Sequence, residues 1–270
     1  MYTNFLVMQD KLAIIGGSGV YELFEGSEKL AIDTPYGKVV NISKITTDGK
    51  EVYFLPRHGP KHSVPPHLIN YRANIYSLHK LGVKNILATN AVGSIDLDIG
   101  PGTFVVPDQI IDMTKNRVLT FYDGETKIEF EDESSREGVI HLDYTDPYCP
   151  RLRNFYVSLL RDLGEKAIET GVNVCAEGPR FETPAEIKFF QKIGGTLVGM
   201  TTVPEAILAR EVKICYATLC LVTNYGAGIQ EEVTHEEVIE LFKEKTNTIK
   251  QIMKKTISQK IESEGCSCIK

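Results

Sequence analysis

The chain has 270 residues and a formal net charge of −6, and 42% of its residues are hydrophobic and 24% charged. These values exclude a disordered or collagen-like chain and allow a sizeable core without disulfides or metals. The sequence has no apolar run of the roughly 20 residues that a membrane helix needs, and no basic stripe of the kind that binds a nucleic-acid backbone. Its N-terminus lacks a basic region and a clean cleavage site, so we expect no signal peptide and a cytoplasmic protein.

Strand-like runs and one helical pattern make up the first half of the chain. The predicted strands cover residues 12–15, 52–55, 85–89 and 103–107. Residues 68–81 have apolar side chains at helical spacing and predict a helix that stops at Gly82. Residues 114–148 are polar and charged, which indicates a long excursion or hairpin loops.

The second half alternates between helices and strands. Predicted helices cover residues 150–163, 184–193, 204–211 and 234–260, and predicted strands cover 172–175, 196–199 and 215–223. Thr234 and Glu237 have the spacing of a capping box at the start of the last helix. The alternation predicts an α/β fold around a largely parallel or mixed sheet. No linker divides the chain, so we expect one domain over residues 1–270, with a core at 12–260 and a C-terminal tail at 261–270.

Polar and glycine-rich motifs follow several predicted strands directly. They are Gly16-Gly-Ser-Gly19, Arg57-His58-Gly59, residues 89–94, residues 177–182 and Thr223-Asn224. Each motif is weak by itself. In open α/β folds, ligands bind beyond the carboxyl ends of the strands, so the shared placement predicts one composite site.

The first two motifs suit an anion. Glycines at 16–19 let backbone N–H groups and the Ser18 hydroxyl form an anion nest, although a plain turn explains the loop equally well. The loop has neither the third glycine of a dinucleotide fingerprint nor the Lys of a Walker loop. Arg57 can grip phosphate through two N–H groups, and His58 can add a donor. Pro60 separates His58 from the next histidine, which argues against a helical metal pair, and we expect no metal in the site.

No side chain stands out as a nucleophile, and the cysteines are scattered. The six cysteines are Cys149, Cys175, Cys215, Cys220, Cys266 and Cys268. Three interpretations stay open: structural disulfides, as in intracellular proteins of hyperthermophiles, thiols without a role, or a metal site at the Cys-Ser-Cys tail. The tail has no accompanying CxxC pair or His cluster, which argues against the metal.

Together, five motifs resemble those of the trimeric purine nucleoside phosphorylase and methylthioadenosine phosphorylase family. They are Gly16-Gly-Ser-Gly19, Arg57-His58-Gly59, Asn90-Ala-Val-Gly-Ser94, Glu177-Gly-Pro-Arg-Phe181 and Gly199-Met-Thr-Thr-Val-Pro-Glu205. The resemblance implies a single-domain fold with a central mixed sheet flanked by helices, a homo-oligomer (a trimer or a dimer of trimers) and a place in purine salvage. It also implies reversible phosphorolysis of purine nucleosides, with inorganic phosphate as co-substrate and without a cofactor or metal.

The resemblance also assigns the site residues. The phosphate site would comprise Ser18, Arg57, His58, Asn90, the backbone N–H of Ala91, and Thr201. The base and ribose site would comprise Phe181, Glu182, Met200, Asn224, His235 and Val238. Within these sets Asn224 and His58 would take part in catalysis. His141 would reach the site of a neighbouring subunit.

Two residues depart from the methylthioadenosine pattern and favour 6-oxopurines. A Glu182 carboxylate accepts the N1–H of a 6-oxopurine, while the Asn224 amide donates to O6 and accepts from a proton-bearing N7. Adenine has an acceptor at N1, which an ionised Glu182 repels. His235 aligns with a His that donates to the 5′-hydroxyl, although Val238 would still suit a methylthio group. We therefore expect inosine and guanosine as substrates, with methylthioadenosine or methylthioinosine phosphorolysis as the alternative.

Resemblance to hyperthermophile relatives further implies that Cys149, Cys215, Cys220 and the Cys-Ser-Cys tail are bridged. Six cysteines allow many full pairings, and the sequence does not select among them. The partners of each cysteine therefore stay open at this point.

Overall fold

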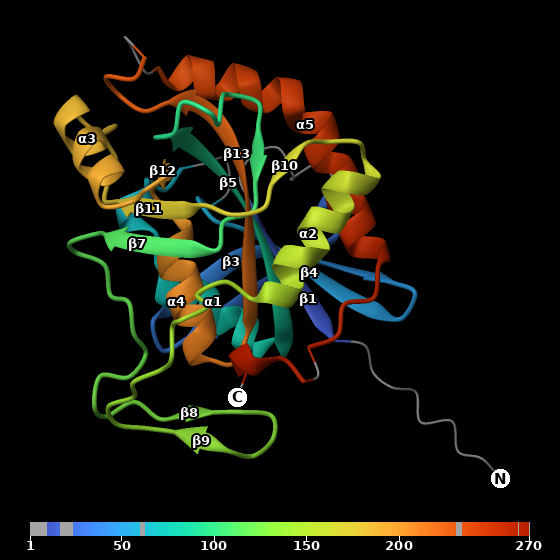
Figure 1. The fold of residues 1–270 in the computed structure, drawn as a ribbon. Coiled ribbons are helices and arrows are strands. Elements are labelled where there is room, and N and C mark those ends of the chain that lie inside the picture. The colour runs from blue at the N-terminus through green and yellow to red at the C-terminus, as the bar shows by residue number, and fades with distance from the viewer. Residues whose placement is uncertain (1–9, 17–23, 60–62, 231–233, 264, 270) are drawn as a thin grey trace.

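The computed structural model describes residues 10–16, 24–59, 63–230, 234–263 and 265–269. Within these ranges, eleven strands form one sheet around which the helices pack (Figure 1). Its main path runs in the order β10 (Ala167–Ile168), β6 (Phe104–Val105), β13 (Cys215–Tyr225), β5 (Val83–Ser94), β1 (Lys11–Gly16), β4 (Lys50–Pro56), β3 (Gly37–Thr47) and β2 (Glu28–Thr34). The expected α/β fold with a central mixed sheet is confirmed.

The four central strands, β13, β5, β1 and β4, are parallel neighbours and are buried along almost their whole length. Their sequences are nearly continuous apolar runs, as expected for strands with helices on both sides. Successive side chains alternate between the faces, so Ile14 and Phe54 belong to one core cluster while Ile15 and Leu55 belong to the other. Because these strands are parallel, the residues that follow them meet at one edge of the sheet.

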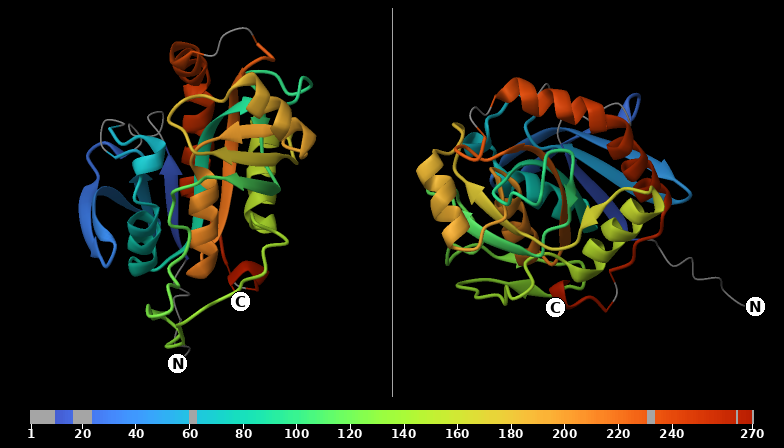
Figure 2. Two further views of the ribbon diagram at one scale, coloured as in Figure 1. Left: turned by 90° about the vertical axis from the view of Figure 1, so that its left-hand side faces the viewer. Right: turned by 45° about the horizontal axis from the view of Figure 1, so that its top comes forward.

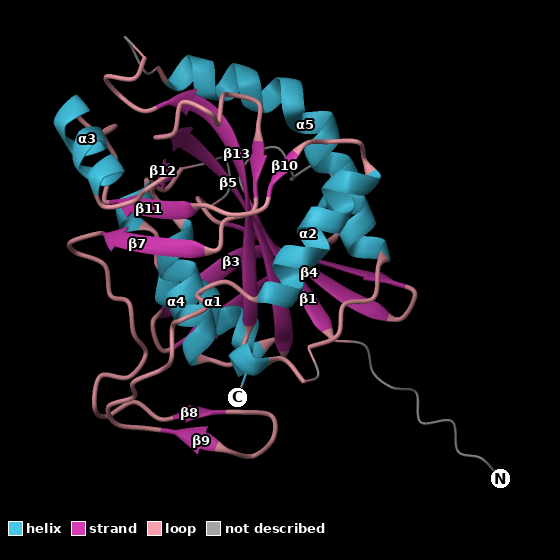
Figure 3. Ribbon diagram, in the orientation of Figure 1, coloured by secondary structure: helices cyan, strands magenta, loops and turns pink. Residues whose placement is uncertain are grey.

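Helices cover both faces of the sheet (Figure 3). On one face, α1 (Tyr71–Lys80) and α4 (Thr202–Glu211) share a core cluster with β1, β4 and β13. On the other face, α2 (Pro150–Asp162) and α5 (His235–Ser258) pack over alternate residues of the same strands. The fold therefore has three layers, with the sheet between two layers of helices, and its long central strands are shielded from solvent.

A side branch of the sheet leaves the end of β5. The last residues of β5 pair antiparallel with β12 (Leu197–Gly199), β12 pairs with β11 (Val172–Ala176), and β11 pairs with β7 (Gln109–Met113). Figure 2 shows the branch beside one end of the long strands β5 and β13. α3 (Pro184–Lys192) covers it through Ile187 and Phe190. The branch thus brings the segments after β11 and β12 to the carboxyl edge of the central strands.

Several strands lie where the sequence pattern predicted none. β2, β3, β7 and β10 carry mixed polar and apolar residues, because strands at or near a sheet edge bury fewer side chains than central ones. The polar excursion at 114–148 contains the short hairpin of β8 (Ile128–Glu129) and β9 (Ser135–Arg136), so the expectation of hairpin loops there is confirmed. No helix in the described ranges is long and apolar enough to cross a membrane.

Local hydrogen bonds set the helix starts. The Asn70 side chain accepts from the Ala73 N–H, so α1 begins at Tyr71 rather than at the predicted residue 68. Thr183 and Glu186 form a complete capping box at the start of α3. The Glu237 side chain lies outside the described part of the structure, so the predicted capping box between Thr234 and Glu237 stays a prediction.

Candidate active site

The ends of β4, β5, β12 and β13 meet at the carboxyl edge of the sheet. Arg57 follows β4 directly, Asn90 lies in β5 opposite Cys220 of β13, and Thr201 follows β12. Ser18 falls in segment 17–23, which lies outside the described residues, so its predicted role stays a prediction. The other residues of the predicted phosphate site are all near these strand ends.

A buried ion pair fixes the guanidinium of Arg57. Its Nε and Nη2 atoms donate to the two carboxylate oxygens of Glu205 at 2.5 and 2.9 Å, and Nη1 donates to the Thr89 carbonyl at 2.8 Å. Tyr216 adds a hydrogen bond to Glu205 at 2.6 Å. Arg57 is 4% exposed and Glu205 1%, so neither charge is solvated by bulk water.

This pairing keeps Arg57 charged and leaves it two spare donors. Burial by itself would lower the pKa of Arg57, and the carboxylate of Glu205 outweighs that effect and raises the pKa above its usual value. A guanidinium has five N–H groups, of which three are used by described partners. The remaining two belong to Nη1 and Nη2 and can bind an anion. Glu205 was part of a sequence motif, but its pairing with Arg57 was not predicted.

Asn90, Thr201 and Thr202 form a small polar cluster beside the predicted anion site. Thr201 Oγ1 donates to Asn90 Oδ1 at 3.3 Å, and Asn90 Nδ2 donates to Thr202 Oγ1 at 3.4 Å. All three residues are buried. A side chain at Gly199 would bring its Cβ within 2.8 Å of Asn90 Nδ2, so only glycine lets β12 approach β5 this closely. The half-buried Ala91 follows Asn90 in β5, opposite Leu221.

The His58 ring is oriented by the chain that follows it. Nδ1 lies 2.9 Å from the Val64 carbonyl, and the Val64 N–H donates to the His58 carbonyl at 2.9 Å. A carbonyl can only accept, so Nδ1 carries a proton and donates. In neutral His58 the other ring nitrogen, Nε2, is then an acceptor, and it becomes a donor only in the imidazolium form.

Glu182 and Asn224 come from segments that pack against each other. A Cβ at Gly226 would lie 2.9 Å from Ile187 of α3, and one at Gly228 would lie 2.6 Å from Pro184. The loop that carries Glu182 therefore lies beside the end of β13, which carries Asn224. The structure thus brings into contact two segments that are far apart in sequence.

One carboxylate oxygen of Glu182 is buried without a hydrogen-bond partner among the described residues. Burial raises the pKa of Glu182, and hydrogen bonding to its own backbone N–H offsets part of that effect. Asn224 is 5% exposed, accepts from Thr223 Oγ1 at 2.9 Å and donates to the Tyr225 carbonyl at 2.8 Å. Its second amide N–H has no described partner, and Glu182 Oε1 lacks the donor that a buried acceptor needs.

The remaining predicted residues are placed as follows. Met200 packs against Gly178, where a Cβ would come within 2.7 Å of the Met200 sulfur. Phe181 is 37% exposed, and His141 is exposed on the excursion before α2. His235 starts α5 and Val238 follows in its first turn, but both side chains lie outside the described part, so their predicted roles stay untested.

Arg117 is a structural clamp that sequence reasoning missed. Its guanidinium donates to the Met200 carbonyl at 2.5 Å, the Glu177 carbonyl at 2.7 Å and the Tyr71 hydroxyl at 3.2 Å. Its side chain is 2% exposed, so these bonds form away from water. The clamp holds the segments after β11 and β12, which carry Met200 and the residues before Phe181. Arg117 lies in the charged excursion, and no local pattern distinguishes it there.

Two cysteines near the site are unsuited to nucleophilic catalysis. Cys220 in β13 and Cys175 in β11 are buried, and burial raises the pKa of each to about 12. Both are therefore protonated near neutral pH, whereas the thiolate is the reactive form. This arrangement fits the expectation that the chemistry needs no enzyme nucleophile.

A family model and several known proteins match this chain. The family described as "Phosphorylase superfamily" matches residues 11–258. The chain belongs to this superfamily. As a phosphorylase it is 49% identical over 262 residues to the probable 6-oxopurine nucleoside phosphorylase of Thermococcus kodakarensis, with 96% of each chain covered. It is 48% identical over 260 residues to the 6-oxopurine nucleoside phosphorylase of Pyrococcus furiosus, again with 96% of each covered.

Other relatives of this phosphorylase carry different substrate names. A probable S-methyl-5′-thioinosine phosphorylase of Methanothermobacter thermautotrophicus is 47% identical over 261 residues, which is 95% of this chain and 87% of that protein. The structure of methylthioadenosine phosphorylase from Schistosoma mansoni in complex with adenine has a TM-score of 0.83 at 32% identity and covers 93% of this chain and 91% of that one. The fold is thus shared across enzymes whose named substrates differ at the base and at the 5′ position.

Proposed function

We propose that this phosphorylase catalyses the reversible phosphorolysis of purine nucleosides to a free purine base and (deoxy)ribose 1-phosphate, and that it favours 6-oxopurine nucleosides such as inosine and guanosine. It is then a pentosyltransferase. The observation that carries the proposal is the buried oxygen of Glu182, which has no described partner and lies in a loop that packs against the segment after Asn224. The names of its relatives support the reaction and this base preference.

In the proposed reaction, Arg57, Asn90 and Thr201 hold phosphate through N–H and O–H groups, together with Ser18 and the Ala91 N–H. A phosphate oxygen forms a bond to the anomeric carbon of the ribose while the bond from that carbon to the purine N9 breaks, and the electron pair leaves with the base. The departing purine takes up a proton at N7 from solvent, which balances the proton that monohydrogen phosphate gives up, and the Asn224 amide oxygen can accept from this N7–H. Fixed donors that need no rearrangement stabilise such developing charge efficiently.

His58 would act on the proton of the phosphate. Since its Nδ1 donates to Val64, a neutral His58 has an acceptor at Nε2, which suits the P–OH of monohydrogen phosphate. The dianionic nucleophile is then held by one full cation and several neutral donors. This combination binds phosphate without immobilising it by excess charge.

The base preference follows from Glu182. Hypoxanthine and guanine carry an N1–H that would give the buried oxygen the donor it lacks, while O6 would accept from the Asn224 amide. Adenine presents an acceptor at N1 and would leave that oxygen unpaired. Leaving a buried acceptor unpaired costs about 1–3 kcal/mol, which corresponds to roughly tenfold to a hundredfold in kcat/KM.

The second candidate is phosphorolysis of S-methyl-5′-thioinosine, because relatives at 47% and 46% identity carry that name. Its base is the same 6-oxopurine, so Glu182 and Asn224 do not distinguish it from inosine. The distinction depends on the 5′ group, for which His235 favours a hydroxyl and Val238 a methylthio group. Methylthioadenosine, with a 6-amino base, fits Glu182 less well.

The reaction and the base preference are both tested by measuring phosphate-dependent base release. The substrates to compare are inosine, guanosine, adenosine, methylthioadenosine and methylthioinosine. We expect inosine and guanosine to react with the highest kcat/KM and no base to appear without phosphate. A strong preference for adenosine-type substrates would contradict the role of Glu182. Binding of purines without release of base would contradict the enzyme itself.

The wider setting belongs to the same proposal. We infer a single-domain, cytoplasmic enzyme of purine salvage that works without a cofactor and assembles as a trimer or dimer of trimers, with His141 reaching a neighbouring subunit. The exposed position of His141 is compatible with that contact. Sedimentation of the full-length chain measures the assembly.

A further inference from the structure

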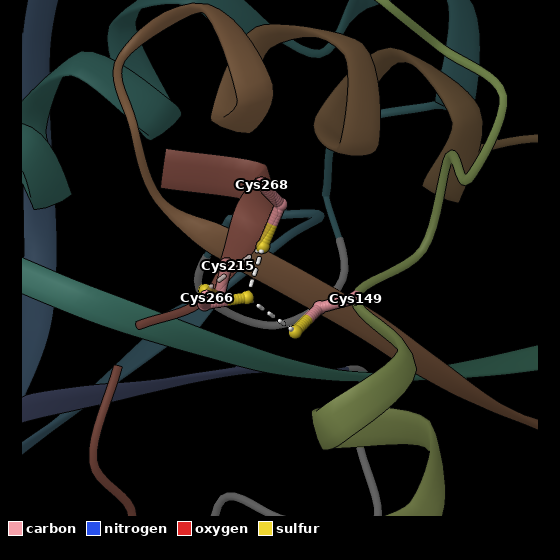
Figure 4. Close-up of side chains that lie close together, drawn as sticks. All are labelled: Cys149, Cys215, Cys266 and Cys268. Carbon is pink, nitrogen blue, oxygen red and sulfur yellow. Dashed lines mark hydrogen bonds between the residues drawn. The ribbon is translucent and has the colours of Figure 1, made fainter. Parts of the chain in front are cut away.

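Four of the six cysteines gather at one place in the fold (Figure 4). We call Cys149, Cys215, Cys266 and Cys268 the four-cysteine cluster, and their sulfur atoms all lie within 4.8 Å of one another. Asn224 lies nine positions after Cys215 in the same strand, which is roughly 30 Å at about 3.3 Å per residue. The four-cysteine cluster is therefore separate from the candidate active site.

Three distant parts of the chain supply the sulfurs. Cys149 is the residue before α2, and Cys215 is the first residue of β13. Cys266 precedes the short 3-10 helix η4 (Ser267–Ile269), which contains Cys268. The sequence left bridges, idle thiols and a metal open for these residues. The structure shows all six cysteines unbridged, and it places Cys220, which was grouped with them, in the core near Asn90 instead.

The spacing of the sulfurs suits one metal ion. The separations are 2.8 Å for Cys266–Cys268, 3.1 Å for Cys215–Cys268 and 3.5 Å for Cys149–Cys266. Four thiolates at about 2.3 Å from a tetrahedral zinc ion lie about 3.8 Å from one another, which is within about 1 Å of each of these separations. Two disulfides require only two close pairs, whereas here all four sulfurs converge on one point.

The surroundings suit a centre with negative charge. Cys149 is the N-cap residue of α2, where the N–H groups of a helix start favour negative charge, and Asn85, to which Arg151 donates, lies opposite Cys215 in the sheet. Arg151 is held in place by a 2.5 Å hydrogen bond from Nη2 to Asn85 Oδ1. Four thiolates and one divalent cation sum to a charge of −2, and N–H donors with a nearby guanidinium stabilise such a centre.

We propose that the four-cysteine cluster binds a structural Zn²⁺ ion through four thiolates. Binding forms four Zn–S bonds and releases the four S–H protons to solvent, so it needs no oxidant or reductant. Sulfur ligands select zinc or iron over magnesium and calcium, and a site closed by four protein ligands leaves no open position for catalysis.

The ion fastens the C-terminal segment to the sheet. This segment is also held by polar bonds at its start, such as Lys50 Nζ to the Gln259 carbonyl at 2.7 Å, and by Ile261 and Ile269, which pack in the core cluster of α2 and α5. Cys215 and Cys268 are 53 positions apart, and Cys149 and Cys266 are 117 apart. Linking such distant residues restricts the unfolded chain and stabilises the fold.

Two measurements on the full-length protein, purified without added reductant or chelator, test the proposal. They are its metal content and its number of free thiols in denaturant. We expect about one zinc ion per chain and six reactive thiols once a chelator is added. Absence of metal with two or more thiols missing would show that the cysteines are bridged and would overturn the proposal.

Cobalt binding provides a readout that does not depend on how the protein was expressed. Titration of the fully reduced, metal-free chain with Co²⁺ should saturate at about one equivalent and give the absorption of tetrahedral thiolate coordination. Six free thiols that bind neither Zn²⁺ nor Co²⁺ would equally overturn the proposal.

Matched variants locate the site. Cys268→Ser and Cys266→Ser change only the C-terminal segment and should lose the bound metal and lower the unfolding temperature. Cys175→Ala and Cys220→Ala lie outside the four-cysteine cluster and should keep one metal per chain. Retention of the metal by both tail variants would contradict the assignment. Since the cluster lies far from the strand edge with Arg57, the fate of this proposal is independent of the proposed reaction.

Discussion

Strand β4 carries a buried cation at each end, and the two ends are built differently. Lys50 begins the strand at 3% exposure, and Arg57 follows it at 4%. Arg57 has a carboxylate partner in Glu205, which keeps its pKa above the usual value although burial opposes this. Lys50 donates to the Gln259 carbonyl, and burial lowers its pKa to about 8, with no carboxylate paired to it in the described ranges. A cation with a counterion keeps its charge for a ligand, whereas one without loses its proton more readily.

The two ends of β13 also differ in the kind of side chain that they carry. At its carboxyl end, hydrogen bonds with Thr223 and the Tyr225 carbonyl fix the orientation of the Asn224 amide. At its start, Cys215 lies in the four-cysteine cluster, next to the C-terminal segment that carries Cys266 and Cys268. One edge of the sheet therefore presents polar groups for recognition, and the other edge holds the fold together. The following four changes break or sharpen this contrast, in order of decreasing effect.

Removing the cation at the site edge should have the largest effect. Arg57→Ala removes the charge proposed to bind phosphate, and we expect kcat/KM to fall by roughly 10³-fold, as when a preorganised donor is lost from an active site. It also leaves the Glu205 carboxylate buried and unpaired, which costs about 3–5 kcal/mol of unfolding free energy. Steady-state kinetics and denaturant unfolding measure the two losses.

The double variant Arg57→Met with Glu205→Leu separates those losses. It removes both buried charges, so part of the lost stability should return, less about 1–3 kcal/mol for the Tyr216 hydroxyl that loses its acceptor, while activity stays low. An active double variant would exclude Arg57 from the phosphate site.

Loss of the clamp should have the next largest effect. Arg117→Met leaves the buried carbonyls of Met200 and Glu177 without their donor, so we expect a loss of about 2–4 kcal/mol in unfolding free energy. KM for the nucleoside should rise because the Met200 segment is released. Arg117→Lys should rescue only part of the loss, since an ammonium group cannot reproduce the divergent N–H groups of a guanidinium. Equal stability of all three proteins would contradict the clamp.

Changing the base-reading group should have a smaller, selective effect. Glu182→Gln keeps the shape but removes the acceptor-only carboxylate, so kcat/KM for inosine should fall by roughly tenfold to a hundredfold while the ratio of adenosine to inosine rises. Glu244→Gln, an exposed change on α5, serves as the control and should alter neither rate. A uniform loss for both nucleosides would indicate that Glu182 supports the loop rather than the base.

The smallest effect should come from the opposite end of β4. Lys50 has a folded pKa of about 8, below that of an unfolded lysine, so folding penalises its charged form at neutral pH. Below pH 8 the charged Lys50 destabilises the fold fully, and this destabilisation disappears as the pH rises from 8 toward the pKa of an unfolded lysine. Over that range the unfolding free energy of the wild type should therefore rise relative to that of Lys50→Met. After the loss of the Gln259 hydrogen bond is included, Lys50→Met should be about 1 kcal/mol more stable at pH 7.

Unfolding free energies at pH 7 and above pH 10 test this sign directly. The advantage of Lys50→Met should shrink or reverse at the higher pH. A constant difference across the range would show that the charge of Lys50 is not penalised in the fold.

The sequence by itself determined the central strands, most helices and the strand edge at which the predicted site residues lie. Runs such as residues 12–15 and 215–223 are apolar because both faces of these strands are buried, so local composition reports their position. Arg57, Asn90 and Asn224 could be predicted because the loops after parallel strands meet at one edge whatever the details of packing.

Only the tertiary structure decided what depends on partners distant in sequence. The pairing of Arg57 with Glu205, the clamp of Arg117 and the meeting of four cysteines join residues that no local spacing connects. The edge strand β2 and its neighbour β3 were missed for a related reason, because their mixed side chains become a strand pattern only once β3 pairs with β4 and β2 pairs with β3. Periodicity records which face of an element is buried, whereas hydrogen-bond partners and metal-ligand sets are fixed only when the elements pack.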